Sequence, residues 1–143
     1  MKPQGWIQEP LYTKIKALTP IPTVDLLVTH KDKLLLMLRN NPPAKDQWFT
    51  PGGRIFKDET LEEAVKRVLH EETGLHPTSI TQISTMSHIW PQAHTVTTYY
   101  KVEVDSDKVK PDQQHRDYRW INTMEDDLHP YLVEMIETAE LFR

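Results

Sequence analysis

The sequence predicts a single mixed α+β domain in which helices cover a β-sheet. Three observations predict this fold class. Apolar residues recur at helical spacing in three separate stretches, and β-prone apolar runs lie between them. The order is helix, strands, helix, strands, helix, which differs from the regular alternation of a doubly wound parallel sheet. The chain has 143 residues, enough for one full hydrophobic core, so residues 1–143 are interpreted as one domain.

The first predicted elements are a short helix and a hairpin. The helix is expected at residues 8–18. Its apolar residues at helical spacing are Leu11, Ile15 and Leu18. Two prolines then favour an extended chain. Residues 23–30 and 33–39 are apolar, β-prone runs on either side of a short polar turn, which predicts two paired strands.

A loop and the main helix follow. Residues 40–53 contain three prolines and two adjacent glycines, so they predict a loop with a brief strand at residues 48–50. The main helix is expected to begin near Asp58 or Glu59 and to end at Gly74, a residue type that caps helix C-termini. Its apolar positions follow the helical period and are Leu61, Ala64, Val65, Val68 and Leu69.

The last third of the sequence predicts three strands and a closing helix. The strands are expected at residues 80–90, 95–104 and 118–121. The helix is expected at residues 130–141, with Pro130 at its first position. Its core-facing residues are Leu132, Met135 and Ile136.

Composition and charge exclude several classes of protein. The net charge of −4 argues against a general binder of nucleic acid or of anionic membranes. The chain has no cysteine, which excludes disulfides and thiolate metal sites. Residues 1–10 lack an apolar signal-peptide core, and no apolar run reaches the roughly 18 residues of a membrane span. A cytoplasmic protein without membrane or nucleic-acid partners is therefore expected.

The main helix carries carboxylates that point to metal chemistry. Its apolar stripe leads through Val68 to Glu72, so Glu72 is expected to face inward. A buried carboxylate needs a compensating partner, either a cation or an arginine. A glycine turn lies before the same helix, so Glu72 is interpreted as a metal ligand. For Glu62 and Glu63 a solvated face with i,i+4 ion pairs is the interpretation.

The glycine turn offers oxygen and nitrogen atoms of the backbone. Gly52 and Gly53 allow the main chain to approach a ligand closely, with carbonyls available to a metal and amides to a phosphate. A carboxylate together with backbone carbonyls forms an all-oxygen donor set. Such a set suits Mg²⁺, with Mn²⁺ as the alternative.

Taken together, this segment resembles the signature of the Nudix hydrolases. The matching positions are Gly53, Glu59, Arg67, Leu69, Glu71, Glu72, Gly74 and Leu75. The departure among the fixed positions is Val68, where the family has glutamate. The resemblance implies the Nudix fold, a mixed sheet between α-helices (α/β/α), and hydrolysis of a nucleoside diphosphate linked to another group.

Within that family the chain is most similar to the GDP-mannose mannosyl hydrolase branch. Residues 39–64 and 110–120 carry this similarity. That branch has a modified signature, uses a single Mg²⁺ on the diphosphate, and directs water to the sugar C1 rather than to phosphorus. The resemblance therefore implies that the valine at position 68 marks a one-metal site. This chain departs from the branch at Glu71, where the branch can have alanine, and is shorter around residues 90–94 and at the C-terminus.

The resemblance implies roles for individual residues. The implied metal ligands are the Gly52 carbonyl, Glu72 and Gln114, and the carboxylate pair adds Glu71 as a further candidate. His115 is the implied general base. It also lies in a polar stretch before an aromatic strand, as expected of a loop that delivers a side chain to a site. An imidazole there can accept a proton from the attacking water near neutral pH. The other histidines, apart from His88, are interpreted as structural or surface residues: His30, His70, His76, His94 and His129.

The remaining implied site residues engage the substrate. Arg39 and Arg54 are expected to bind the diphosphate, with structural ion pairs as the alternative. Arg67 is placed with the catalytic residues and is expected to orient a glutamate. His88 matches a catalytic histidine. Further expected substrate contacts are Asp25, Tyr118 and Tyr100, the last as a ring that can stack on a base or sugar.

Three functions stay open at this point. The leading one is Mg²⁺-dependent hydrolysis of GDP-mannose, or GDP-glucose, to GDP and hexose. The second is attack on phosphorus of a nucleoside triphosphate or another nucleoside diphosphate derivative, which retention of both Glu71 and Glu72 permits. The third is a nucleotide-binding module that lost catalysis with the glutamate at position 68. The expected partner is a small nucleotide sugar, and the resemblance implies a homodimer.

Overall fold

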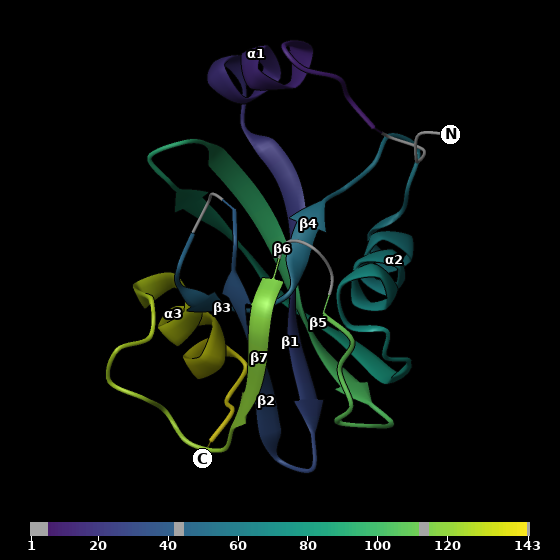
Figure 1. The fold of residues 1–143 in the computed structure, drawn as a ribbon, viewed down its shortest axis with the longest axis vertical. Helices are drawn as coiled ribbons and strands as arrows, with labels where there is room; N and C mark the ends of the chain where they lie inside the picture. Colours follow the sequence, from purple (N-terminus) through teal and green to yellow (C-terminus); the bar gives the residue numbers. More distant parts are fainter. Residues whose placement is uncertain (1–5, 42–44, 112–114, 143) are drawn as a thin grey trace.

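The computed structural model describes residues 6–41, 45–111 and 115–142, and in them a mixed β-sheet lies between helices (Figure 1). The predicted α+β fold with an α/β/α arrangement is confirmed. The elements in chain order are α1 (Leu11–Leu18), β1 (Ile21–His30), β2 (Lys33–Arg39), β3 (Trp48–Phe49), β4 (Gly52–Arg54), α2 (Leu61–Thr73), β5 (Pro77–Ile89), β6 (His94–Val104), β7 (His115–Ile121) and α3 (Pro130–Thr138).

The central strand β1 changes partner along its length. At the hairpin end it pairs antiparallel with β2, where Thr29 lies opposite Leu34. Toward its start it pairs instead with β4, where Asp25 lies opposite Gly52. On its other edge β1 runs parallel to β6, which pairs antiparallel with β5. Because β1 and β2 separate, the glycine segment enters the sheet beside the first half of β1.

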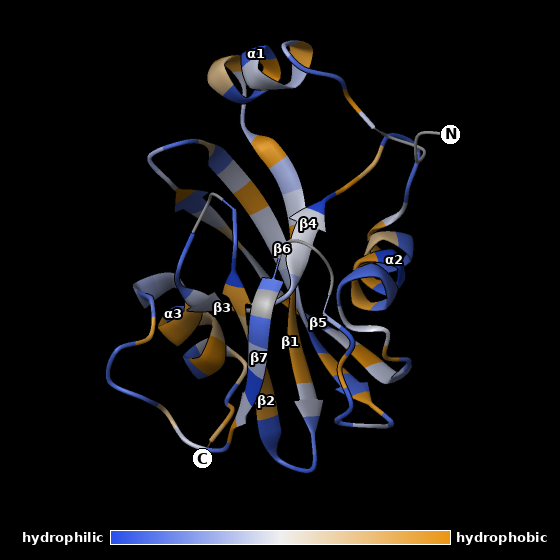
Figure 2. Ribbon diagram, in the orientation of Figure 1, coloured by the Kyte–Doolittle hydropathy of each residue, from blue (hydrophilic) through white to orange (hydrophobic). Residues whose placement is uncertain are grey.

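The core is divided into two clusters by the sheet, with α2 and α3 on opposite sides (Figure 1). On the α2 side β1 contributes Val24, Leu26 and Val28. On the α3 side the strands contribute Leu27, Leu34 and Leu36. Figure 2 shows α3 as largely orange, whereas most of α2 is blue. The helix α2 therefore buries one apolar stripe and leaves most of its surface to solvent.

The ends of α2 follow from local chemistry. Thr60 caps the N-terminus, and its side chain and that of Glu63 form a reciprocal capping box. Asp58 and Glu59, expected near this end, lie just before the cap, where Asp58 has φ of 68° and the Glu59 side chain accepts from Arg67. Gly74 has φ of 70° and ends the helix as predicted.

Several predicted boundaries differ from the structure. The glycine segment forms the short strand β4 rather than a loop, because β1 offers it a free edge. Strand β5 begins at Pro77 instead of residue 80, and β7 begins at His115 instead of residue 118. Helix α3 ends at Thr138 rather than residue 141. The last three differences add or remove residues at an element end, where tertiary pairing decides.

The predicted N-terminal helix is present as α1, but it has no buried residue. Leu18 is 84% exposed, and Leu11 is exposed as well. In the described part of the chain, no helix combines the length and apolarity needed to span a membrane.

Candidate functional site

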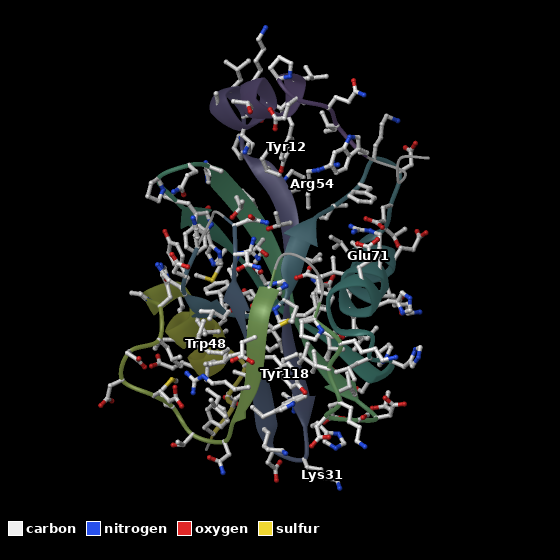
Figure 3. The ribbon with its side chains drawn as sticks, viewed as in Figure 1. Tyr12, Lys31, Trp48, Arg54, Glu71 and Tyr118 are labelled. Carbon is white, nitrogen blue, oxygen red and sulfur yellow. The ribbon has the colours of Figure 1, made fainter. Side chains whose placement is uncertain are left out.

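A cavity of about 520 Å³ lies where β1, β4, the α2 inner face and the end of β5 meet. Most of the predicted site residues line it, namely Asp25, Arg39, Gly52, Arg54, Arg67, Glu71, Glu72 and His88. Figure 3 shows Arg54 beside Tyr12 below α1, and Glu71 on α2. The fold thus collects residues spread over more than sixty positions of the chain into one concave site.

Gly52 is packed against the carboxylate of Asp25. A Cβ atom at position 52 would lie 2.1 Å from Asp25 Oδ1 and 2.9 Å from the Val24 carbonyl oxygen. At Gly53 the nearest atom would be Val68 Cγ2, at 3.3 Å. The sequence explained the glycine pair by close approach to a ligand. The structure adds that position 52 has no room for any side chain while β4 pairs with β1.

Gly52→Ala is expected to destabilise the fold by about 1–3 kcal/mol, the usual cost of inserting a methyl group into a packed site. The Val24 carbonyl belongs to the backbone, so β4 must move away from β1 to admit a Cβ atom. Urea unfolding measures the effect. Gly53→Ala is the matched control, with an expected smaller loss because only a side chain must shift. Equal losses in both variants would contradict the tight packing of position 52.

Asp25 is the buried acid of the cavity. Its Oδ2 accepts a 2.7 Å hydrogen bond from the Thr97 hydroxyl on β6. Burial raises the pKa of Asp25 to about 6, against the opposing effects of Thr97 and Arg39. The Nδ1 atom of His88 lies 3.9 Å from Asp25 Oδ2, too far for a hydrogen bond. Burial, with a smaller effect of His129, lowers the pKa of His88 to about 4, so His88 is neutral at pH 7.

The inner face of α2 shows what the valine does. Val68 is 1% exposed and packs beside Gly53, and Glu72 one turn further is also buried. The predicted inward direction of Glu72 is therefore confirmed. Glu71 lies at the cavity rim with its side chain 52% exposed. The oxygen donors near this face are Glu72, Glu71 and the backbone at Gly52, a set that fits Mg²⁺ or Mn²⁺ in kind. Within the described ranges, no three acidic or imidazole side chains form a metal-holding group.

Arg67 connects the parts of the glycine–helix segment. Its Nε and Nη2 donate to the Glu59 carboxylate at 2.7 and 3.0 Å, and Nη2 also donates to the Arg54 carbonyl at 2.8 Å. Its Nη1 donates to Glu71 at 3.2 Å. The guanidinium also lies 3.6 Å from the centre of the Phe56 ring. These bonds hold the segment after β4 on α2, which agrees with the expectation that Arg67 orients a glutamate.

His115 and Gln114 differ in what can be said of them. The His115 side chain is fully buried, and its Nε2 lies 3.4 Å from Glu72 Oε1. It stands beside the expected metal ligand rather than among the described residues that line the cavity. Gln114, the other predicted ligand from this segment, lies outside the described residues.

Two expected substrate contacts lie away from the cavity. Tyr100 is buried in the α2-side core, and its hydroxyl donates to Gln82 at 3.2 Å. Tyr118 packs at the edge of the same core, on β7 opposite Met37. Alternation along the strands turns both rings toward the α2-side core, whereas the cavity lies at the β4 end of the sheet, so their contact with substrate stays a prediction.

Sequence reasoning missed the contribution of the N-terminal segment. Trp6, Tyr12 and Lys16 line the cavity, and the Arg54 guanidinium lies 5.7 Å from the Tyr12 ring centre. Burial raises the pKa of Tyr12, although Arg54 opposes this shift. The local pattern of residues 8–18 does not signal that contact, because the position of α1 beside the cavity depends on the tertiary structure. Thr97 was missed for the same reason.

The sequence and fold were compared with known proteins. The NUDIX domain family matches residues 19–137. The low-salt glycan biosynthesis protein Agl8 of Haloferax volcanii is 32% identical over 147 residues, covering 97% of this chain and 94% of that protein. An ADP-ribose pyrophosphatase of Methanocaldococcus jannaschii is 34% identical over 95 residues, covering 65% of this chain and 56% of that protein.

Solved structures agree with this match. The NUDIX domain of Shewanella oneidensis NrtR complexed with ADP ribose has a TM-score of 0.72 and 28% identity, covering 94% of this chain and 97% of that chain. A MutT protein from Methanosarcina mazei has a TM-score of 0.75 and 26% identity, covering 86% and 95% of the two chains. The family match over most of the chain, together with the signature on β4 and α2, shows that this protein belongs to the Nudix hydrolase family.

Proposed function

We propose that the protein hydrolyses a nucleoside-diphosphate sugar, GDP-mannose or GDP-glucose, to GDP and free hexose with Mg²⁺ as cofactor. The observation that carries this proposal is the inner face of α2. Because buried Val68 replaces a carboxylate there, Glu72 is the one buried carboxylate of the helix. A helix face with one buried carboxylate suits a single divalent ion better than a metal cluster. A single ion serves best on the diphosphate, which makes GDP a better leaving group.

The proposed reaction is substitution at the sugar carbon. The oxygen of a water molecule bonds to C1 while the bond between C1 and the β-phosphate oxygen breaks. GDP leaves with the electron pair of that bond, and the proton of the attacking water passes to His115. When bound, Mg²⁺ supplies charge neutralisation for the departing diphosphate.

Residues of the cavity hold the substrate in this proposal. Glu72 and the Gly52 carbonyl are the proposed metal ligands, with Glu71 at the rim and Gln114 as an additional predicted ligand. Arg39 and Arg54 line the cavity, and their planar guanidinium groups suit bidentate hydrogen bonds to phosphate oxygens. Asp25 and His88 add a buried acid and a neutral imidazole to the cavity lining.

The relatives support the substrate class. The name of Agl8 refers to glycan biosynthesis, a process that uses activated sugars. The Methanocaldococcus relative is named for ADP-ribose, and the Shewanella domain binds it. ADP-ribose is itself a nucleoside diphosphate joined to a sugar.

We infer from the exposed apolar side chains of Trp6, Leu11 and Leu18 that the protein forms a homodimer, which sedimentation velocity tests.

A second candidate function is hydrolysis at phosphorus. Two observations favour it: Glu71 stands next to Glu72 at the cavity rim, and one relative is named a pyrophosphatase. In this reaction the oxygen of a water molecule bonds to one phosphorus atom while the bond between that phosphorus and the oxygen that bridges the two phosphates breaks, and a nucleoside monophosphate is among the products. The proposed C1 reaction gives a nucleoside diphosphate instead, so the products separate the two functions.

Product analysis in ¹⁸O-water tests the proposal. The protein with Mg²⁺ is incubated with GDP-mannose, GDP-glucose, ADP-ribose and nucleoside triphosphates, and products are identified by mass spectrometry. We expect GDP and hexose, with the label on the hexose. Nucleoside monophosphate with labelled phosphate would establish attack at phosphorus. Binding of these compounds without turnover would identify a nucleotide-binding module.

A further inference from the structure

Five aromatic rings form one cluster at the β5 end of the cavity. They belong to Phe49, His88, Trp90, His129 and Tyr131. Phe49, His88 and Trp90 line the cavity, whereas His129 and Tyr131 come from the start of α3. The C-terminal helix therefore contacts a predicted catalytic residue from behind the cavity wall.

Tyr131 makes two contacts with this wall. Its ring is stacked on the His88 imidazole, with centroids 4.2 Å apart and planes inclined by 7°. Its hydroxyl accepts from the Ile89 amide at 2.8 Å and lies 3.3 Å from the Ile89 carbonyl oxygen, to which it can donate. One side chain thus holds both the imidazole and the backbone of the next residue.

The orientation of His88 depends on packing. The side chain is 1% exposed, and in the described part of the chain neither ring nitrogen makes a hydrogen bond. The nearest carboxylate, that of Asp25, is 3.9 Å from Nδ1. The torsion that turns an imidazole has broad minima, so hydrogen bonds or packing must fix it. Phe49 and Trp90 contact the imidazole edge to face, with ring centroids 6.2 and 5.6 Å away. Tyr131 is the ring of this cluster that stacks face to face on it.

The support itself is anchored at the start of α3. His129 caps this helix, and its Nδ1 accepts from the Tyr131 amide at 3.0 Å. The His129 ring lies 4.9 Å from the Tyr131 ring and 5.0 Å from the Trp90 ring. The first turn of α3 is thereby fixed against β5.

We propose that Tyr131 is a positioning residue, which holds the His88 imidazole in the orientation that the reaction requires. This inference rests on the proposed hydrolase function, in which His88 contacts the substrate. Tyr131 itself does not line the cavity, so it acts through His88.

Tyr131→Leu tests this role. It removes the stack and the hydroxyl, and turnover of the substrate found by product analysis is expected to fall about 10–10²-fold with little change in KM, as for a misplaced reacting group. Tyr131→Phe keeps the stack and is expected to stay within about 5-fold of the wild type, the effect of one lost hydrogen bond. Val133→Ala is the matched control, because Val133 lies on α3 and packs on the same core without a ring contact to His88.

A double-mutant cycle separates positioning from general destabilisation. His88→Phe keeps an aromatic ring and removes the nitrogens. In this background Tyr131→Leu is expected to cause no further loss of turnover. The same loss in both backgrounds, or an equal loss in Val133→Ala, would overturn the proposal and leave Tyr131 a merely structural residue.

NMR of histidine-labelled protein gives a readout that does not depend on the reaction. The His88 ring is expected to show one sharp set of signals in the wild type and in Tyr131→Phe, and exchange-broadened signals in Tyr131→Leu. Unchanged sharp signals in Tyr131→Leu would overturn the proposal. Absence of hydrolysis by the wild type, with broadened signals in Tyr131→Leu, would reject the proposed function and retain Tyr131 as the support of His88.

Discussion

Glu72→Gln is expected to lower kcat/KM about 10²-fold or more and to weaken Mg²⁺ binding in parallel. Glu72 is the one buried carboxylate of α2, and amides are much weaker ligands for a hard cation. Loss of a residue that merely supports a metal ligand already costs about 10–10²-fold in affinity. Glutamine has nearly the same shape, so the fold should survive. Mg²⁺ titration by calorimetry and steady-state kinetics measure the two effects.

Glu71→Gln is the matched control for this experiment. Glu71 is next in the sequence, but its side chain is half exposed and makes an i,i+4 ion pair with Arg67. Exposed ion pairs contribute little to stability. Glu71→Gln is therefore expected to lower kcat/KM and Mg²⁺ affinity much less than Glu72→Gln does. Equal losses in the two variants would indicate that both carboxylates bind metal. That outcome would favour the multi-metal chemistry of attack at phosphorus and contradict the one-metal proposal.

His115→Gln is expected to lower turnover about 10²–10⁴-fold, the range for loss of a general base. The His115 Nε2 lies 3.4 Å from Glu72 Oε1, which places the imidazole next to the proposed metal ligand. Glutamine retains hydrogen-bonding capacity but cannot accept the proton of the attacking water. The effect is expected mainly in kcat, and stopped-time assays with Mg²⁺ at saturation measure it.

Two further variants define the outcome for His115. His70→Gln on the exposed side of α2 is the control and is expected to leave turnover unchanged. Asp25→Asn removes the other buried proton acceptor, whose pKa burial raises to about 6. Near-normal turnover of His115→Gln combined with a large loss in Asp25→Asn would transfer the role of base to Asp25. If the loss of turnover in His115→Gln is accompanied by a clear drop in its melting temperature, the buried position of His115 is mainly structural.

The part of the site on β4 and α2 was predictable because it is local in sequence. The helical period of α2 alone turns Val68 and Glu72 inward, and both are buried. The signature spacing from Gly53 to Gly74 likewise depends only on one turn and one helix. The role of Arg67 toward Glu71 also follows from i,i+4 spacing, and the structure contains that bond.

The strand sequences gave less information about which side of the sheet each side chain faces. Both sides of this sheet are covered, so their strands carry apolar residues on both faces. Tyr99 and Tyr100 are both buried, on opposite sides of β6. A continuous apolar run cannot show which ring faces a cavity, so the position of Tyr100 in the α2-side core was not predictable from the sequence.

By itself, the sequence determined the fold class, the helix that carries the carboxylates and the inward direction of Glu72. Only the tertiary structure decided which distant residues share the cavity. Asp25 meets Gly52 because β1 leaves β2 and pairs with β4, and it meets Thr97 because β6 lies on its other edge. Tyr131 reaches His88 because α3 packs on the end of β5. Such contacts depend on the pairing and packing of whole elements, which local periodicity does not encode.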